Sequence, residues 1–246
     1  MEKILIGRLN KNEVLLKALH PNRLTINLLL VINTFLLVIV YPTIKCNAQT
    51  IYRGKPWANM SQIIPGKLEC EKYDLGGEGI AYHDKDSINN GSGKLNPNDG
   101  TFYNTFRINE GVDISYTKPH GIDENPYNIV EPVMKQLYVG WTEAGEWIKY
   151  SIVVKKGGFY QGELMYTANA DAKIAIDIDD KPWLEPVLIK STYNSNDTIA
   201  WRQWHHWNKQ EIFSALKLTK GRHVLTLKTI EKGNMNYDFI AFRRLK

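Results

Sequence analysis

Residues 146–154 read EWIKYSIVV, and this stretch decides the fold. Its apolar positions alternate with the others and are Ile148, Tyr150, Ile152 and Val154. A period of two residues predicts a β-strand with one buried face. The turn sequence KKGG at 155–158 leads into a second run, FYQGELMYTA, at 159–168. Two such runs joined by a short glycine turn predict a β-hairpin.

The same kind of segment recurs toward the C-terminus. Short alternating or apolar runs, separated by turns of Gly, Asp, Lys and Pro, occupy 173–179, 213–218, 224–230 and 237–242. Long helical periodicity is absent from the body of the chain. Short strands divided by turns favour two packed antiparallel sheets, so we predict an all-β fold, a β-sandwich.

An apolar run, LTINLLLVINTFLLVIVY at 24–41, follows a basic stretch and precedes small residues around Ala48. This pattern predicts an N-terminal signal peptide over residues 1–48, cleaved near Ala48. The alternative is an uncleaved membrane anchor through the apolar run, whose length is close to that of a spanning helix. Both interpretations predict an exported body that is secreted, periplasmic or held at the cell surface.

The charge of the chain is concentrated in this leader. The full chain of 246 residues has a formal net charge of +5. Residues 1–48 carry six basic and two acidic side chains, which leaves 25 basic and 24 acidic side chains in the rest. A nearly neutral body lacks the basic surface that phosphate-backbone binding needs, so we expect no nucleic-acid partner.

Downstream of the leader, residues 49–63 are predicted to be an irregular lead-in and residues 64–246 a single domain. Two segments of this domain, 84–135 and 181–200, lack strand patterns and are rich in loop residues. We expect both to lie at one end of the sandwich, where loops place recognition groups on a rigid frame. Cys70 is the only cysteine after the leader and is predicted to be buried without a disulfide partner.

Tryptophan is crowded into one short element. All seven Trp residues lie in the body, and three of them fall within WRQWHHW at 201–207. Three indoles so close along the chain cannot all face one interior, so at least one is expected to be exposed. Exposed aromatic planes fit the apolar faces of sugars, whose hydroxyl rims then need polar partners.

Four segments in order resemble a family 6 carbohydrate-binding module over most of residues 64–246. They are LECEKYD at 68–74, VGWTEAGEWIKYSIVV at 139–154, HHWNKQEIFSALKLTKGRHVLTL at 205–227 and GNMNYDFIAF at 233–242. The resemblance implies a jelly-roll sandwich without catalytic activity that binds polysaccharide in a cleft between loops and works alongside glycoside hydrolases. The long loops depart from the family pattern and leave the sugar open.

The resemblance also implies site residues. Tyr82 and Trp204 take the places of two aromatic rings that face each other across a sugar, and Asn236 that of an amide bonded to a sugar hydroxyl. The alternatives are a loop-packing role for Tyr82, a core role for Trp204 with Trp201 as the stacking ring, and a turn role for Asn236.

The family's structural calcium implies a role for Glu69, Glu71 and Asp238. Glu69 and Glu71 are expected on one face of the first strand, and Asp238 on the last strand, so that three carboxylates surround a hard cation. The alternative is that these are surface acids paired with Lys or Arg.

Other functions have weaker support in the sequence. Glu143 and Glu146 are candidates for the two carboxylates of a glycan-cleaving enzyme. Adjacent His205 and His206 would point to opposite faces of a strand, which disfavours a shared metal ion. The third hypothesis is an envelope adhesion module that binds protein.

Overall fold

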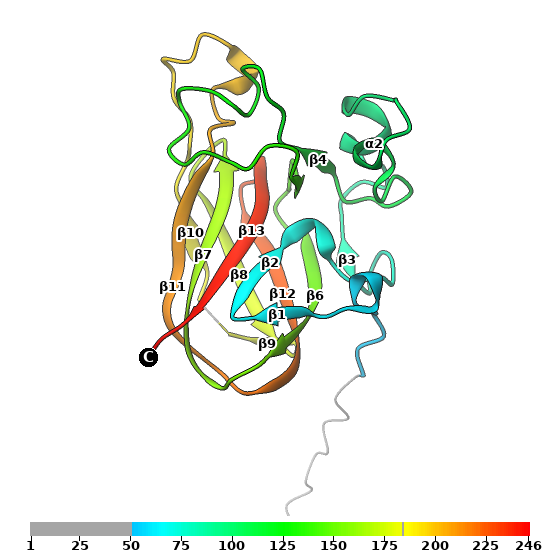
Figure 1. Ribbon diagram of the computed structural model, residues 1–246, viewed down its shortest axis with the longest axis vertical. Helices are drawn as coiled ribbons and strands as arrows, with labels where there is room; N and C mark the ends of the chain where they lie inside the picture. Colours follow the sequence, from blue (N-terminus) through cyan, green and yellow to red (C-terminus); the bar gives the residue numbers. More distant parts are fainter. Residues whose placement is uncertain (1–50, 184) are drawn as a thin grey trace, which may run out of the picture. The chain divides into compact units, whose positions relative to one another are not determined.

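The computed structural model describes residues 51–183 and 185–246 (Figure 1). The predicted leader, with its apolar run at 24–41 and the cleavage site near Ala48, lies outside the described residues. Among the helices of the described residues, none has the length and apolar character needed to cross a membrane.

Two sheets make up the body, as the sequence predicts. The first has the order β1 (Gln62–Ile64), β6 (Trp147–Val154), β12 (Gly221–Glu231), β8 (Ala172–Ile178) and β10 (Val187–Ile189). Two further short strands extend it, β3 (Tyr82–His83) on β6 and β9 (Lys181–Pro182) on β8. The second sheet has the order β11 (Asn208–Leu218), β7 (Gly158–Ala168), β13 (Met235–Arg244), β5 (Leu137–Val139) and β4 (Ile114–Tyr116), with β2 (Gly66–Glu69) on β13.

Pairing is antiparallel throughout these sheets except between β1 and β6, which run parallel. The predicted all-β, jelly-roll β-sandwich is therefore confirmed. Helical structure in the described residues is confined to short pieces, which are η1 (Trp57–Asn59), η2 (Cys70–Lys72), η3 (Gly91–Leu95), α2 (Phe102–Thr105) and η4 (Ala200–Arg202).

Strand β6 shows how the sequence builds the core. Its burial alternates strictly along Trp147–Val154, and the four residues predicted to face inward are all buried. Ile152 is fully buried and lies opposite Gln62 of β1 and His223 of β12. Cys70 is also buried and free, as predicted.

The predicted hairpin at 155–158 is wrong. β6 belongs to the first sheet, whereas β7 pairs with β11 and β13 in the second. The turn therefore carries the chain from one sheet to the other, and the buried faces of β6 and β7 both contribute to the core between the sheets. A short turn is compatible with either arrangement, because burial alternates with the same period in both.

The expected first strand also ends early. β2 stops at Glu69, and Cys70–Lys72 forms the single turn η2. Glu71 thus lies on a helical turn and not on the strand face that it was predicted to share with Glu69.

Long loops gather at one end of the sandwich (Figure 1). The segment 117–136 and the segment 190–207 lie side by side there, joined by the Tyr127 hydroxyl, which donates to the carbonyl of Asn196 at 2.8 Å. The Arg202 guanidinium also donates to the carbonyl of Gly121. These loops come from the two segments without strand patterns and from the WRQWHHW element that follows the second.

A second apolar cluster anchors these loops to the sheet. Fully buried Trp207 packs with Tyr138, Met165 and Phe239, apart from the main core between the sheets. The carbonyl of Trp207 accepts the backbone N–H groups of Ile129 and Val130, both at 2.9 Å. The indole of Trp207 therefore fixes the end of the second loop in the cluster, and its backbone carbonyl fixes the course of the first loop.

The alternation in β6 can be tested by a matched pair of truncations. We expect Ile152→Ala to lower the free energy of unfolding by about 2–5 kcal/mol, because it leaves a cavity in a packed core. Val153→Ala, at the half-buried neighbouring position, is expected to cost about 1 kcal/mol or less. Urea denaturation measures both, and equal losses would contradict the assigned faces.

Candidate functional site

A groove of about 420 Å³ lies at the loop end of the sandwich. Its aromatic lining consists of Tyr138, Trp141, Trp201, Trp204 and the imidazole of His205. The first long insertion adds Leu95, Ser115, Lys118 and Ile122. The groove is thus formed where the two long loops meet the ends of the strands.

The three Trp residues of WRQWHHW take three different environments. Trp201, in η4, is 55% exposed, Trp204 is half-buried in the groove, and Trp207 is fully buried. The carbonyl of Trp204 accepts a hydrogen bond from the Thr192 hydroxyl at 2.5 Å, which holds this loop residue in place. Trp204 lies edge-on to His205, with 5.6 Å between ring centroids.

Trp141 is placed by a buried amide. Its backbone N–H donates to Oδ1 of Asn236 at 3.0 Å, and its φ of 45° is unusual for a residue with a side chain. A Cβ atom at the preceding Gly140 would lie 3.2 Å from the same Oδ1, so glycine allows the close approach. The amide therefore fixes the backbone of a groove indole.

Asn236 is fully buried, and both its amide oxygen and its amide nitrogen are hydrogen-bonded inside the protein. Its Nδ2 donates to Thr167 Oγ1 at 2.8 Å and to His205 Nδ1 at 2.9 Å. No hydrogen of this amide is left for a ligand. The structure thus assigns Asn236 a positioning role, whereas the resemblance predicts direct contact with sugar.

The same network fixes the imidazole in the groove. Because Asn236 donates to His205 Nδ1, the ring proton lies on Nε2, which donates to Asp123 Oδ1 at 2.6 Å. Burial alone would raise the pKa of Asp123, but hydrogen bonds headed by that from His205 hold the pKa below its ordinary value. The Trp207 indole donates to the same oxygen at 2.7 Å. The carboxylate of Asp123 therefore links His205 in the groove to the buried Trp207 cluster.

His206 belongs to a separate structural cluster. Its Nε2 lies 3.0 Å from Asp197 Oδ2, and Asp197 also accepts two hydrogen bonds from the Arg202 guanidinium, at 2.6 and 2.9 Å. The two adjacent histidines therefore have different carboxylate partners, which fits the expectation that they do not share a metal ion.

Tyr82 does not lie in the groove, and its choice as the ring opposite Trp204 needs correction. Tyr82 is 5% exposed in β3, where its ring packs edge-on to Tyr73 and its hydroxyl accepts the N–H of Gly111 at 3.2 Å. The groove indole that the sequence interpretation missed is Trp141. It stands in the Gly–aromatic position of the quoted motif VGWTEAGEW, which was the available signal.

The three acids predicted to bind calcium lie where β2, η2 and β13 meet. Glu71 Oε2 and Asp238 Oδ2 are buried without a hydrogen-bond partner, while Glu69 is paired with Lys72. Burial raises the pKa of Glu71 to about 8 and that of Asp238 to about 7. In residues 51–183 and 185–246, no three His, Cys, Asp or Glu side chains are grouped so as to hold a metal ion.

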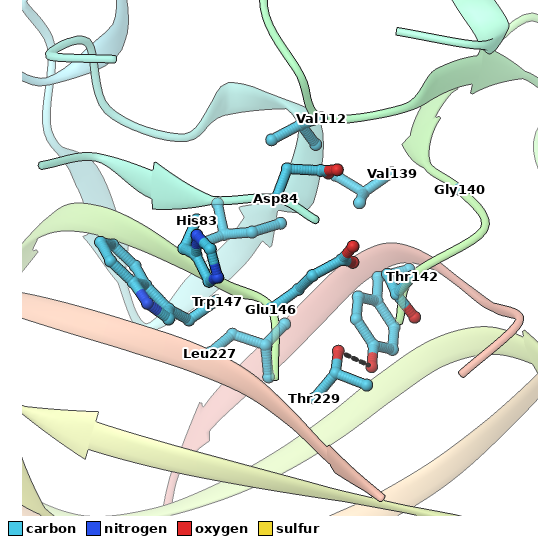
Figure 2. Close-up of a pocket in the computed structure, with 12 residues that line it drawn as sticks. His83, Asp84, Val112, Val139, Gly140, Thr142, Glu146, Trp147, Leu227 and Thr229 are labelled. Atoms are coloured by element: carbon cyan, nitrogen blue, oxygen red, sulfur yellow. Dashed lines mark hydrogen bonds between the residues drawn. The ribbon is translucent and has the colours of Figure 1, made fainter. Parts of the chain in front are cut away.

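Figure 2 shows a second, much smaller cavity, into which the carboxyl groups of Asp84 and Glu146 point. Its volume of about 10 Å³ is at the lower limit for one water molecule and excludes a sugar ring. Burial, reinforced by the charge of Glu146, raises the pKa of Asp84 to about 7. The carboxylate of Glu146 accepts the backbone N–H groups of Glu143 and Lys85, at 2.6 and 3.2 Å, and so braces the turn before β6.

The role of Asn236 can be tested by an apolar replacement of similar size. We expect Asn236→Leu to lower the free energy of unfolding by about 3 kcal/mol or more, because three buried polar groups lose their partner. The His205 ring resonances should shift as well, since Nδ1 loses its donor. Asn98→Leu, at an exposed loop position, serves as the control. Unchanged stability and unchanged His205 resonances would contradict the assigned network.

Several solved structures are similar to this chain. They include CsCBM6-3 from Clostridium stercorarium in complex with cellobiose, with 12% identity and a TM-score of 0.44 over 76% of this chain and 98% of that one. A β-1,3-glucan binding CBM6 from Bacillus halodurans has 14% identity and a TM-score of 0.43, covering 75% and 99%. A glycoside hydrolase family 43 arabinoxylan arabinofuranohydrolase from Bacillus subtilis, in complex with cellotetraose, has 14% identity and a TM-score of 0.44, covering 76% and 28%.

No curated protein matches the chain. The sequence model of the carbohydrate binding module (family 6) matches residues 105–244, which is more than half of the 246 residues. The matched region contains the second sheet from β4 onward, the strands β6, β8 and β12 of the first, and most of the groove. This chain belongs to carbohydrate binding module family 6.

Proposed function

We propose that the chain binds polysaccharide through the aromatic groove and does not cleave it. The observation that carries this proposal is the gathering of Trp141, Trp201, Trp204 and Tyr138 around one open space at the loop end. Indole and phenol rings pack well against the C–H faces of pyranose rings, and membership of the family supports a carbohydrate ligand.

Polar groups in the same groove suit the hydroxyl rim of a sugar. Ser115 and Lys118 lie beside the aromatic rings, whereas both ring nitrogens of His205 are bonded inside the protein, to Asn236 and Asp123. In this proposal Asn236 and His205 act by positioning their neighbours, and the hydrogen bonds to sugar come from Lys118 and Ser115.

The proposed absence of cleavage is supported by the chemistry of the groove. Glycoside hydrolysis commonly uses two carboxyl groups that flank the scissile bond. The described residues that line this groove include no Asp or Glu. Glu146, one of the two carboxylates considered from the sequence, lines a separate cavity that is too small for a sugar ring.

Stacking can be tested at the two half-buried groove indoles. We expect Trp204→Ala and Trp141→Ala each to weaken polysaccharide binding by about three- to tenfold, since an aromatic contact contributes about 0.5–1.5 kcal/mol. Affinity electrophoresis in gels that contain xylan, β-glucan or agar measures the retention. Phe159→Ala, which removes an exposed ring at the start of β7, is the matched control. Retention unchanged in both Trp variants would contradict the groove.

We also propose that Glu71, Asp238 and Glu69 hold a structural calcium ion, which would draw together carboxylates that do not form a three-residue metal group in the described structure. The support is chemical: two buried carboxyl oxygens lack any donor, and carboxylate oxygens are the ligands that Ca²⁺ prefers. A divalent cation there would neutralise carboxyl groups that burial otherwise penalises. Since Glu69 lies opposite Phe239 in the β2–β13 pair, the ion would tie the first strand of this sheet to the last.

Thermal melting tests the calcium proposal. We expect the melting temperature to rise with Ca²⁺ and fall with a chelator, since a ligand at a hundredfold excess over its Kd stabilises the fold by about 3 kcal/mol. Asp238→Asn should abolish this response. Asp171→Asn, an exposed acid paired with Lys190, should keep it. Identical melting in Ca²⁺ and chelator would remove the ion from the proposal.

A further inference from the structure

One cation lines the groove, and it is held by neutral groups. Nζ of Lys118 donates to Ser115 Oγ at 2.9 Å and to the carbonyl of Tyr116 at 3.2 Å, with a longer contact of 3.4 Å to Asn96 Oδ1. It also lies 4.1 Å from the centroid of the Tyr116 ring. These contacts orient the ammonium group at the groove without neutralising its charge.

This partly buried environment without a carboxylate differs from that of the lysines that form ion pairs. Lysines at six positions lie within 4.0 Å of a carboxylate, and they are Lys72, Lys85, Lys149, Lys173, Lys190 and Lys228. In the part of the chain that the structure describes, Lys118 Nζ has no such partner. A partly buried ammonium without a counter-charge has lost hydration that neutral oxygens replace only in part.

The carboxylate that influences the charge of Lys118, that of Asp123, is hydrogen-bonded to other groups. Asp123 is fully buried and accepts hydrogen bonds from the His205 ring, the Trp207 indole and the backbone N–H of Lys118. Burial lowers the pKa of the Lys118 ammonium, and the charge of Asp123 opposes this change. No described Asp or Glu lines the groove itself, so the space that Lys118 helps to line carries no negative charge of its own.

We propose that the groove selects an acidic glycan, whose carboxylate or sulfate group pairs with Lys118 while its sugar ring stacks on the neighbouring indoles. This inference rests on the proposed function and names the substrate class for the same groove. The anionic group would replace the long contact to Asn96 and supply the missing counter-charge. Hydrogen bonds between two charged groups are shorter and stronger than those to a sugar hydroxyl.

Matched pairs of polysaccharides test the proposal and separate the two sources of negative charge. The first pair is glucuronoxylan and its carboxyl-reduced form, and the second is a sulfated galactan and its desulfated form. We expect the protein to bind the charged member of one pair about tenfold more tightly, as a charge-assisted hydrogen bond allows. Added salt should weaken this preference, because a partly exposed ion pair is screened.

Substitutions at Lys118 then test whether this residue causes the preference for the charged polysaccharide. Lys118→Met should remove the preference, so that the charged and neutral members of the pair bind equally, and Lys118→Arg should retain it. Lys94→Met, which changes an exposed lysine of the same insertion, is the control. Equal binding of both members of both pairs, or a preference that survives in Lys118→Met, overturns this inference alone. If the wild-type protein binds none of these polysaccharides, the proposed function is overturned as well.

Discussion

The groove depends on the buried amide of Asn236. One side chain accepts the N–H of Trp141 and donates to His205, so it fixes an indole from the end of β5 and an imidazole from the far loop at once. The chain of contacts continues through His205 to Asp123 and Trp207. Buried polar groups are costly unless they are paired, so each member holds its neighbours in one arrangement.

The sandwich supplies the rigidity that this network needs. Asn236 and Thr167 lie opposite each other on the paired strands β13 and β7, in the middle of the second sheet. The outer cluster around Trp207 then ties the loop 117–136 to the same sheet. Loops alone would leave these aromatic rings mobile. Here the strand backbone holds them on one side and a packed apolar cluster holds them on the other.

The sequence predicts the strands well, because alternation is a local property that β6 displays over its whole length. It does not predict that β6 and β7 lie in different sheets, since the turn between them fits both outcomes. The site divides in the same way. Trp204 stands in a recognisable motif, whereas the pairing of His205 with Asp123 joins residues 82 positions apart, beyond the reach of any spacing argument. Tyr82 turns away from the groove because it pairs with Ile148 of β6 and packs against Tyr73, and neither contact is visible in the sequence around it.

The contacts between the two long loops bear on how the width of such a groove can differ between related proteins. Tyr127 and Arg202 fasten one loop to the other outside the groove, so the separation of its walls is set by residues that a ligand never touches. Changes in loop length at this seam would widen or narrow the opening while the aromatic floor stays the same. Related chains with identical stacking residues would then differ in the polymers they admit.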